Sequence, residues 1–311
     1  RQRQMCIRDR ATSSKWAAQC NLTFMRLRGL LQGFAAFLSL GAVSLGAAPV
    51  AMAQPAGNVV VIGDSYAANP DNQRHWAAKI PGADGSSFLA DYPSNGACLQ
   101  SPDNYPRQLA ARTGLNVADW SCAGLTSWSS IGMVQKAIAR GDINPHTRSV
   151  VLAVGFNNHW PSNTRASGTG FDFGRIGDRY VADMHAAAAK IREVAPHTKI
   201  IIAGMLAMSE PNGAQRFCLI NVVPNAPLGI PVPLLQQVEN NTRNFQERAA
   251  REIGATFVDI KTASASHNTC AKDSERWVSG LVDTTTTHYN MPYHPSRAGS
   301  GFVAQELAKV V

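Results

Sequence analysis

The sequence predicts an α/β protein, built as a three-layer α/β/α sandwich around a central five-stranded parallel sheet. Runs of five or six mostly apolar residues recur five times between residues 58 and 260. A segment with helical spacing of apolar residues separates each run from the next, and another follows the last run. Such regular alternation of strands and helices is typical of a parallel sheet with helices packed on both faces.

The expected strands are mostly apolar, as strands buried on both faces usually are. They are Asn58–Ile62, Asn116–Trp120, Ser149–Val154, Lys199–Ala203 and Thr256–Ile260. Gly63 and Gly155 follow the first and third runs and are expected to end those strands. Ligands of such sheets bind at the carboxyl ends of the strands, so the residues that follow each strand are the first candidates for function.

The expected helices carry apolar residues three and four positions apart, and the first four end close to a glycine or proline. They are Tyr105–Thr113, Ser129–Arg140, Asp178–Val194, Leu234–Ile253 and a last helix that Ser296 caps and that extends to Lys309. Segments rich in Pro, Gly, Asn and Ser are expected to be loops. These loops are residues 69–104, 161–173, 209–232 and 262–292.

Residues 25–53 have the features of a secretory signal peptide. Met25–Arg28 is a short basic region, Gly29–Gly46 is uncharged and mostly apolar, and Ala51–Ala53 offers a cleavage site of the small-x-small type. The apolar stretch is short and lies at the start, which favours a cleaved signal over a membrane anchor. We therefore expect a protein without a stable membrane span that is secreted or associated with the cell wall.

Cleavage would leave one domain over residues 54–311, and residues 1–24 are interpreted as a non-native extension that precedes the signal. Residues 1–53 hold seven of the 29 Lys and Arg residues and one of the 21 Asp and Glu residues. The remaining chain therefore has a net charge of +2, compared with +8 for the whole sequence. This near-balance gives no reason to expect a nucleic acid partner.

Four cysteines remain after residue 53, an even number in a chain that we expect to be exported: Cys98, Cys122, Cys218 and Cys270. Three pairings into two disulfides are possible. We favour Cys98–Cys122 and Cys218–Cys270, because each pair is near in sequence and brackets a segment rich in loop residues. The spacing contains no C-x-x-C unit, which argues against a zinc site.

Gly63-Asp64-Ser65-Tyr66 directly follows the first strand. A Gly-x-Ser turn at this place exposes a hydroxyl group together with a backbone N–H at the edge of the sheet. A serine nucleophile needs this access, and an adjacent N–H group is needed to stabilise an oxyanion. The G-x-S-x-G elbow of α/β-hydrolases is not formed, because Ala67 stands where its second glycine would be.

Four sequence blocks in order along the chain resemble those of the SGNH (GDSL-type) hydrolase family. The matching residues are Ser65 in Gly-Asp-Ser-Tyr, Gly124 after the second strand, Asn157 in Gly-Phe-Asn-Asn after the third, and His294 in His-Pro-Ser before the last helix. The resemblance implies a flavodoxin-like SGNH hydrolase fold in which Ser65 is the nucleophile and His294 its base. It also implies an oxyanion hole made by the N–H groups of Ser65 and Gly124 and the side-chain amide of Asn157.

The sequence departs from the family at the acidic residue, which usually lies three positions before the histidine, where this chain has Met291. A catalytic histidine needs an acceptor at Nδ1. Either Asp283 reaches the ring from the preceding loop, or a backbone carbonyl near Met291 does so. We hypothesise the second arrangement, a Ser–His dyad. His288 is the rival base, and His294 is preferred because it precedes a capped helix.

The resemblance implies a secreted serine esterase or lipase that hydrolyses carboxylic esters of lipids or acylated sugars through an acyl-enzyme. Neither a cofactor nor a metal ion is expected. Two alternatives on the same fold stay open. One is an acyltransferase that passes the acyl group to an alcohol, and the other is an inactive module that binds glycan or lipid. The second alternative is supported only by the missing acidic residue before His294.

Overall fold

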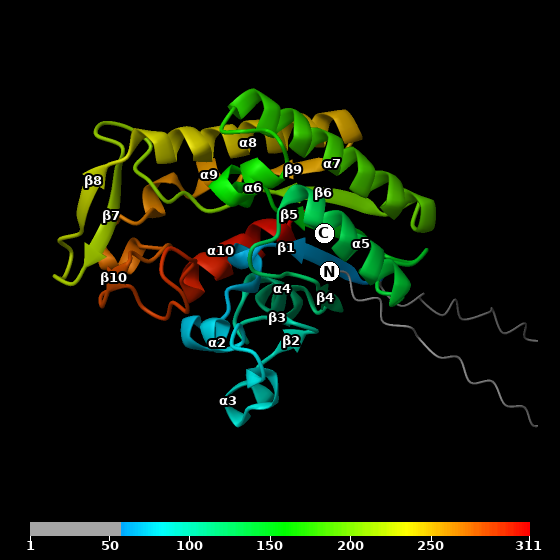
Figure 1. Ribbon diagram of the computed structural model, residues 1–311, viewed down its shortest axis with the longest axis horizontal. Coiled ribbons are helices and arrows are strands. Elements are labelled where there is room, and N and C mark those ends of the chain that lie inside the picture. Colours follow the sequence, from blue (N-terminus) through cyan, green and yellow to red (C-terminus); the bar gives the residue numbers. More distant parts are fainter. Residues whose placement is uncertain (1–56) are drawn as a thin grey trace, which may run out of the picture. The chain divides into compact units, whose positions relative to one another are not determined.

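The computed structural model describes residues 57–311, so the predicted signal peptide and extension lie outside the described residues. Its central sheet has five parallel strands in the order β4-β1-β5-β6-β9 (Figure 1). The strands are β1 (Val59–Gly63), β4 (Val117–Asp119), β5 (Ser149–Ala153), β6 (Lys199–Ala203) and β9 (Thr256–Val258). Every predicted strand is confirmed, and the strand ends differ from the prediction by no more than two residues.

The five predicted helices are also confirmed. They are α4 (Tyr105–Thr113), α5 (Ser127–Ala139), α7 (Phe173–Val194), α8 (Pro233–Ile253) and α10 (Arg297–Ala308). Helices α5 and α7 begin earlier than expected because polar residues cap them. Asp172 accepts the N–H of Arg175 at 3.0 Å, and Thr126 forms a capping box with Ser129. Ser296 caps α10 as predicted.

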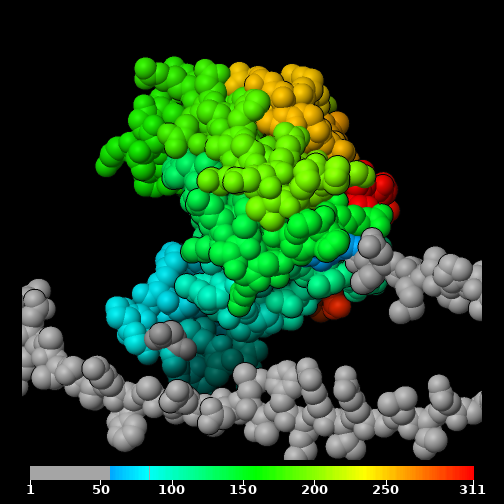
Figure 2. Space-filling model, turned by 90° about the vertical axis from the view of Figure 1, so that its right-hand side faces the viewer, coloured from blue at the N-terminus to red at the C-terminus, as the bar shows by residue number. Residues whose placement is uncertain are grey.

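Helices cover both faces of the sheet, which confirms the three-layer α/β/α architecture. Successive strand residues point to opposite faces. Val60 of β1 shares a core cluster with Tyr180 of α7, whereas Val61 shares a second cluster with Leu109 of α4 and Leu307 of α10. Helices α5, α7 and α8 thus form one layer, and α4 and α10 form the other (Figure 1). Residues near 150–200, in green, form much of the face shown in Figure 2.

Two of the predicted loops contain short regular elements. Residues 69–104 include α2 (Asn72–Ala77), α3 (Ser87–Ala90) and the paired strands β2 (Ser94–Asn95) and β3 (Cys98–Leu99). Residues 161–173 include α6 (Pro161–Ala166), which has a proline in its first turn. Helices of four to six residues are too short to show an apolar period, so composition alone assigned these segments to loops.

The prediction of a loop over residues 209–232 was wrong. Strands β7 (Arg216–Asn221) and β8 (Leu228–Pro231) form an antiparallel hairpin there, and β10 (Val282–Asp283) completes a three-stranded sheet. This sheet lies at one end of the molecule (Figure 1). The prolines that suggested a loop lie beside the strands or at the end of β8, where an edge strand tolerates them. Residues 262–292 are otherwise largely irregular, as predicted.

Both disulfides of the favoured pairing are present. Cys98–Cys122 joins β3 to the segment after β4, and Cys218–Cys270 joins β7 to the segment that precedes β10. Each bond therefore fixes a stretch with little regular structure to the sheet beside it, and such a bond typically contributes about 2–4 kcal/mol to stability. None of the helices in residues 57–311 combines the length and the apolar character needed to cross a membrane.

Candidate active site

The carboxyl ends of three neighbouring strands bring together the segments that carry Ser65, Gly124 and Asn157. Strand β1 lies between β4 and β5 in the sheet. The N–H of Asp64 donates to the carbonyl of Ala153 at 3.1 Å, and the N–H of Cys122 donates to the carbonyl of Gly63 at 2.9 Å. The three predicted segments therefore begin at one edge of the sheet, as expected for a site in a parallel α/β fold.

Ser65 is the first residue of the short helix α1 (Ser65–Ala68). The carboxylate of Asp64 caps this helix by accepting the N–H of Tyr66 at 2.9 Å. A Cβ atom at position 63 would lie 2.4 Å from the Cβ of Ala67, so only glycine lets the chain turn this tightly out of β1. The half-buried Ser65 side chain is thereby held on a rigid turn.

Gly124 lies in a turn in which the N–H of Leu125 donates to the carbonyl of Cys122 at 3.3 Å. Its φ of +86° is the value that the third residue of a type II turn requires, and glycine adopts it without strain. An added Cβ would meet no atom within 4 Å, so backbone conformation requires glycine here, and close packing does not. The Cys98–Cys122 disulfide anchors this turn to β3.

Asn157 lies in the 3₁₀ turn Phe156–His159, and two contacts determine the orientation of its amide. Its Nδ2 donates to the carbonyl of Leu125 at 2.9 Å, and its Oδ1 accepts the indole N–H of Trp160 at 3.0 Å. The second N–H of the amide remains available for a ligand. Within residues 57–311, the backbone N–H groups of Ser65 and Gly124 donate to no protein acceptor. Sequence reasoning missed the role of Trp160, although the i, i+3 spacing within a turn was a usable signal.

Asn158, the residue after Asn157, supports the same turn. Its Oδ1 accepts the N–H of Ser127 at 3.0 Å, and its Nδ2 donates to the hydroxyl of Ser127 at 2.7 Å. The side chain is 2% exposed. Asparagine therefore connects this turn to the start of α5 without placing a charge in the interior.

His294 is oriented by a backbone carbonyl. Its Nδ1 lies 2.8 Å from the oxygen of Pro292. A carbonyl can only accept, so Nδ1 carries the proton and Nε2 carries the lone pair that a general base needs. Nε2 is buried and has no hydrogen-bond partner in the described part of the chain. Burial lowers the pKa of His294 to about 4, and the Pro292 hydrogen bond opposes this shift only in part. The ring is therefore neutral near pH 7.

The loop of His294 is attached to the helix that begins at Ser65. The hydroxyl of Tyr66 donates to the carbonyl of Tyr293 at 2.7 Å, and the amide of Asn69 donates to the carbonyl of Pro295 at 2.9 Å. The rings of Tyr66 and His294 have their centroids 5.2 Å apart. Tyr66 and Asn69 were not predicted as positioning residues, since no pattern in the sequence links them to the loop.

Of the two predicted arrangements, Asp283 does not reach His294, whereas a backbone carbonyl near Met291, that of Pro292, lies 2.8 Å from its Nδ1. The carboxylate of Asp283 instead accepts the N–H groups of Gly280 and Thr286, at 2.8 Å each, and it lies 3.7 Å from the guanidinium of Arg276. The carbonyl of Met291 accepts the hydroxyl of Ser279 at 3.0 Å and the backbone N–H of His294 at 3.2 Å. Asp283 is thus committed to its own loop, and the carbonyl one residue after Met291 holds the ring.

The rival histidine lies elsewhere. His288 is exposed and lines a surface hollow together with Arg112 of α4 and Phe302 of α10. His159 is buried, and its Nε2 lies 2.9 Å from Oδ1 of Asn241. Of these histidines, the ring that is placed beside α1 is that of His294.

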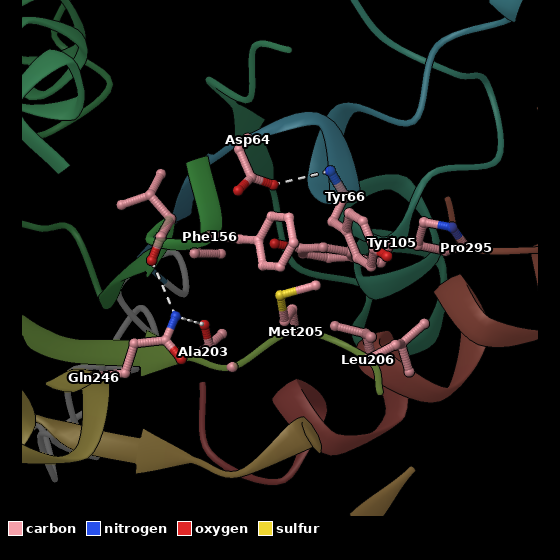
Figure 3. A pocket seen from close by; sticks show the side chains of 13 residues that line it. Asp64, Tyr66, Tyr105, Phe156, Ala203, Met205, Leu206, Gln246 and Pro295 are labelled. Atoms are coloured by element: carbon pink, nitrogen blue, oxygen red, sulfur yellow. Dashed lines mark hydrogen bonds between the residues drawn. The ribbon is translucent and has the colours of Figure 1, made fainter. Parts of the chain in front are cut away.

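A small, partly open cavity lies beneath the turn that carries Ser65 (Figure 3). Asp64, Tyr66, Tyr105 and Phe156 contribute to its lining. Its volume of about 20 Å³ has room for about one water molecule and not for a hydrocarbon chain. Burial raises the pKa of Asp64 to about 7, because the low-dielectric interior disfavours its charged form. This residue thus caps α1 and is poorly suited to act as a permanently ionised acid.

Known proteins share both the sequence pattern and the fold of this chain. The family model of the GDSL-like lipase/acylhydrolase family matches residues 61–301. Lipase 2 of Streptomyces coelicolor is 28% identical over 291 residues, which cover 85% of this chain and 89% of that protein.

Several crystal structures resemble the fold. Phospholipase A1 from Streptomyces albidoflavus NA297 and an extracellular lipase from Streptomyces rimosus both give a TM-score of 0.53, at 18% and 17% identity. Each alignment covers 82% of this chain and 100% of the other. A catalytic mutant of an acetylxylan esterase from Geobacillus stearothermophilus gives a TM-score of 0.50 at 14% identity, with coverage of 82% and 94%. These identities are low, so this likeness shows a common fold.

The family match includes all four sequence blocks, from the strand that precedes Ser65 to the helix that follows His294. The central five-stranded parallel sheet and the two helical layers are those expected of an SGNH hydrolase fold. This chain therefore belongs to the GDSL-like lipase/acylhydrolase family and is a carboxylic ester hydrolase.

Proposed function

We propose that the chain is an exported serine esterase or lipase that cleaves its substrate through an acyl-enzyme on Ser65. Nε2 of His294 removes the proton of the Ser65 hydroxyl as Oγ bonds to the ester carbonyl carbon. The tetrahedral intermediate then collapses, the bond to the alcohol oxygen breaks, and His294 returns the proton to that oxygen. Water then attacks the carbonyl carbon of the acyl-enzyme while His294 takes its proton. The bond to Oγ of Ser65 breaks, His294 returns the proton to Ser65, and the carboxylic acid is released.

The observation that carries this proposal is the state of His294. Its Nδ1 is fixed by the Pro292 carbonyl, its Nε2 is unpartnered within residues 57–311, and its loop is bonded to α1 at Tyr66. These three features suit a Ser–His dyad. The carbonyl selects the tautomer even though it lacks the charge of a carboxylate, Nε2 keeps its lone pair for a proton, and the loop is tied to the helix that begins at Ser65.

Three donors are available for the oxyanion. The backbone N–H groups of Ser65 and Gly124 have no protein acceptor in the described chain, and the Asn157 amide retains one N–H. Their segments leave adjacent strands, so the donors converge on the carboxyl edge of the sheet. Losing one such donor typically lowers kcat by about 10²–10³-fold.

The substrate is proposed to be an ester of a lipid or an acylated sugar. Proteins similar to this chain in sequence or fold include a lipase, a phospholipase A1 and an acetylxylan esterase. Export through the signal peptide at residues 25–53 agrees with the two disulfides, since such bonds persist in oxidising compartments.

Hydrolysis of p-nitrophenyl acetate and octanoate by the chain from Gln54 tests the proposal. We expect Ser65→Ala and His294→Asn to lose at least roughly 10³-fold in kcat while keeping the wild-type circular dichroism. His288→Asn is the matched control, because it changes an exposed histidine whose φ of +50° asparagine tolerates. A fluorophosphonate should label wild type at Ser65. A folded Ser65→Ala protein with wild-type activity would overturn the mechanism.

A further inference from the structure

An open groove with an almost wholly apolar lining runs beside the turn that carries Asn157. Its walls come from Phe156, Trp160 and Phe171 on one side and from Val232, Leu234 and Leu235 on the other. Phe156 and Trp160 lie in and directly after the 3₁₀ turn, and Phe171 lies between α6 and α7. The second group lies at the start of α8. The groove has a volume of about 270 Å³, near the lower end of the range for small-molecule sites.

Large apolar side chains are exposed along this groove. Trp160, Phe171 and Leu234 are 55%, 51% and 52% exposed. Single exposed apolar residues are ordinary, but three large ones around one concave surface form a patch of the kind that binds apolar ligands. The lining therefore selects for a hydrocarbon and offers little to a sugar, which would need hydrogen-bonding partners.

The groove adjoins the candidate active site. Phe156 lines both the groove and the small cavity under the Ser65 turn. Trp160, on the groove wall, holds the amide of Asn157 through its indole N–H. A ligand in the groove would thus begin next to the proposed oxyanion donor, and the cavity of about 20 Å³ is too small to compete for a chain.

The two substituents of the ester carbonyl can be assigned to different sides. The alcohol oxygen must face Nε2 of His294, which lies beside Tyr66. The groove instead adjoins Asn157, so its occupant is the acyl side of the ester. We propose that this groove binds the acyl chain of the substrate and makes the enzyme prefer acyl chains of medium length over acetyl groups. This inference rests on the proposed function.

The test varies the acyl chain on a constant leaving group. Wild type should hydrolyse p-nitrophenyl octanoate with a kcat/KM at least roughly tenfold above that for the acetate, since each buried methylene is worth up to about fourfold. In Leu234→Ser and Phe171→Ser this ratio should fall at least about fivefold. Ile230→Ser is the matched control, because Ile230 is also exposed, at 55%, but lies on the β7–β8 hairpin.

A ratio that is unchanged in both groove variants, or that falls as much in Ile230→Ser, would overturn the assignment. Calorimetric binding of decanoate to Ser65→Ala separates this inference from the proposed function. If wild type cleaves no ester, but Ser65→Ala binds decanoate and the added Leu234→Ser substitution weakens that binding, the groove assignment stands and the esterase proposal is refuted. Ester cleavage by wild type without groove-dependent binding or chain preference would do the opposite.

Discussion

Replacing Asp283 with asparagine distinguishes a structural carboxylate from a catalytic one. One carboxylate oxygen accepts the N–H groups of Thr285 and Thr286, at 3.1 and 2.8 Å. The other accepts the N–H of Gly280, the amide of Asn221 and the hydroxyl of Thr286, at 2.8, 3.0 and 2.7 Å. An asparagine has one acceptor oxygen, so its NH₂ group must face at least two of these donors.

The expected loss of stability follows from these contacts. The introduced asparagine would be uncharged, and the side chain of Arg276, which is 0% exposed, would lose one of its two carboxylate neighbours. Breaking a buried ion pair from one side typically costs about 3–5 kcal/mol. For a domain of this size that corresponds to a Tm lowered by roughly 6–20 °C. The hydrogen bonds to the carboxylate hold the pKa of Asp283 below its usual range despite burial, so its contribution is present near pH 7 and is lost as the pH falls through that lowered pKa.

Activity should respond much less than stability. The Pro292 carbonyl, and not Asp283, holds the ring of His294, so we expect kcat to change by less than about tenfold once the variant is folded. The assay pairs thermal unfolding with p-nitrophenyl octanoate hydrolysis at about 15 °C, where circular dichroism checks the fold. Asp273→Asn is the control, because it removes the other carboxylate beside Arg276. A loss of kcat above a thousandfold in folded Asp283→Asn would refute the dyad.

Three further predictions concern the ionisation and orientation of groups at the site. Because burial lowers the pKa of His294 to about 4, the acid limb of kcat/KM should lie near pH 4, and a limb near 6.5 would contradict its buried environment. Asp64→Asn keeps a cap for the N–H of Tyr66 but cannot ionise. The pKa of Asp64 in the folded protein, about 7, exceeds the ordinary value of 3.8, so wild type loses stability as the pH rises through 7. Denaturant titrations should therefore show the variant gaining about 2–3 kcal/mol in stability relative to wild type between pH 5 and 8. Trp160→Phe keeps an aromatic groove wall but removes the donor to Asn157, so kcat should fall about tenfold on acetate and octanoate alike with KM little changed, whereas a loss confined to KM would show that the indole serves only binding.

The amino-acid sequence alone specifies the frame of the molecule. Runs of apolar residues mark strands whose two faces are both buried, and Val60 and Val61 do face opposite layers. Gly63 and Gly124 could be identified because their backbones need glycine, although at Gly124 the reason is the positive φ and not close packing. The apolar period of a strand or helix and a glycine required by a turn both depend on residues close together in the sequence, so a single sequence reveals them.

Packing in three dimensions selects the group that holds each candidate side chain. The acceptor of His294 is a carbonyl, which every residue possesses, and the φ of +63° at Tyr293 accompanies the turn that presents it. Asp283 was the alternative partner that the sequence left open, and only packing shows that it binds Gly280 and Thr286 instead. The groove likewise joins residues near 160 to residues near 234. Contacts between such distant segments depend on how layers pack, and packing is non-local, so no window of the sequence encodes it.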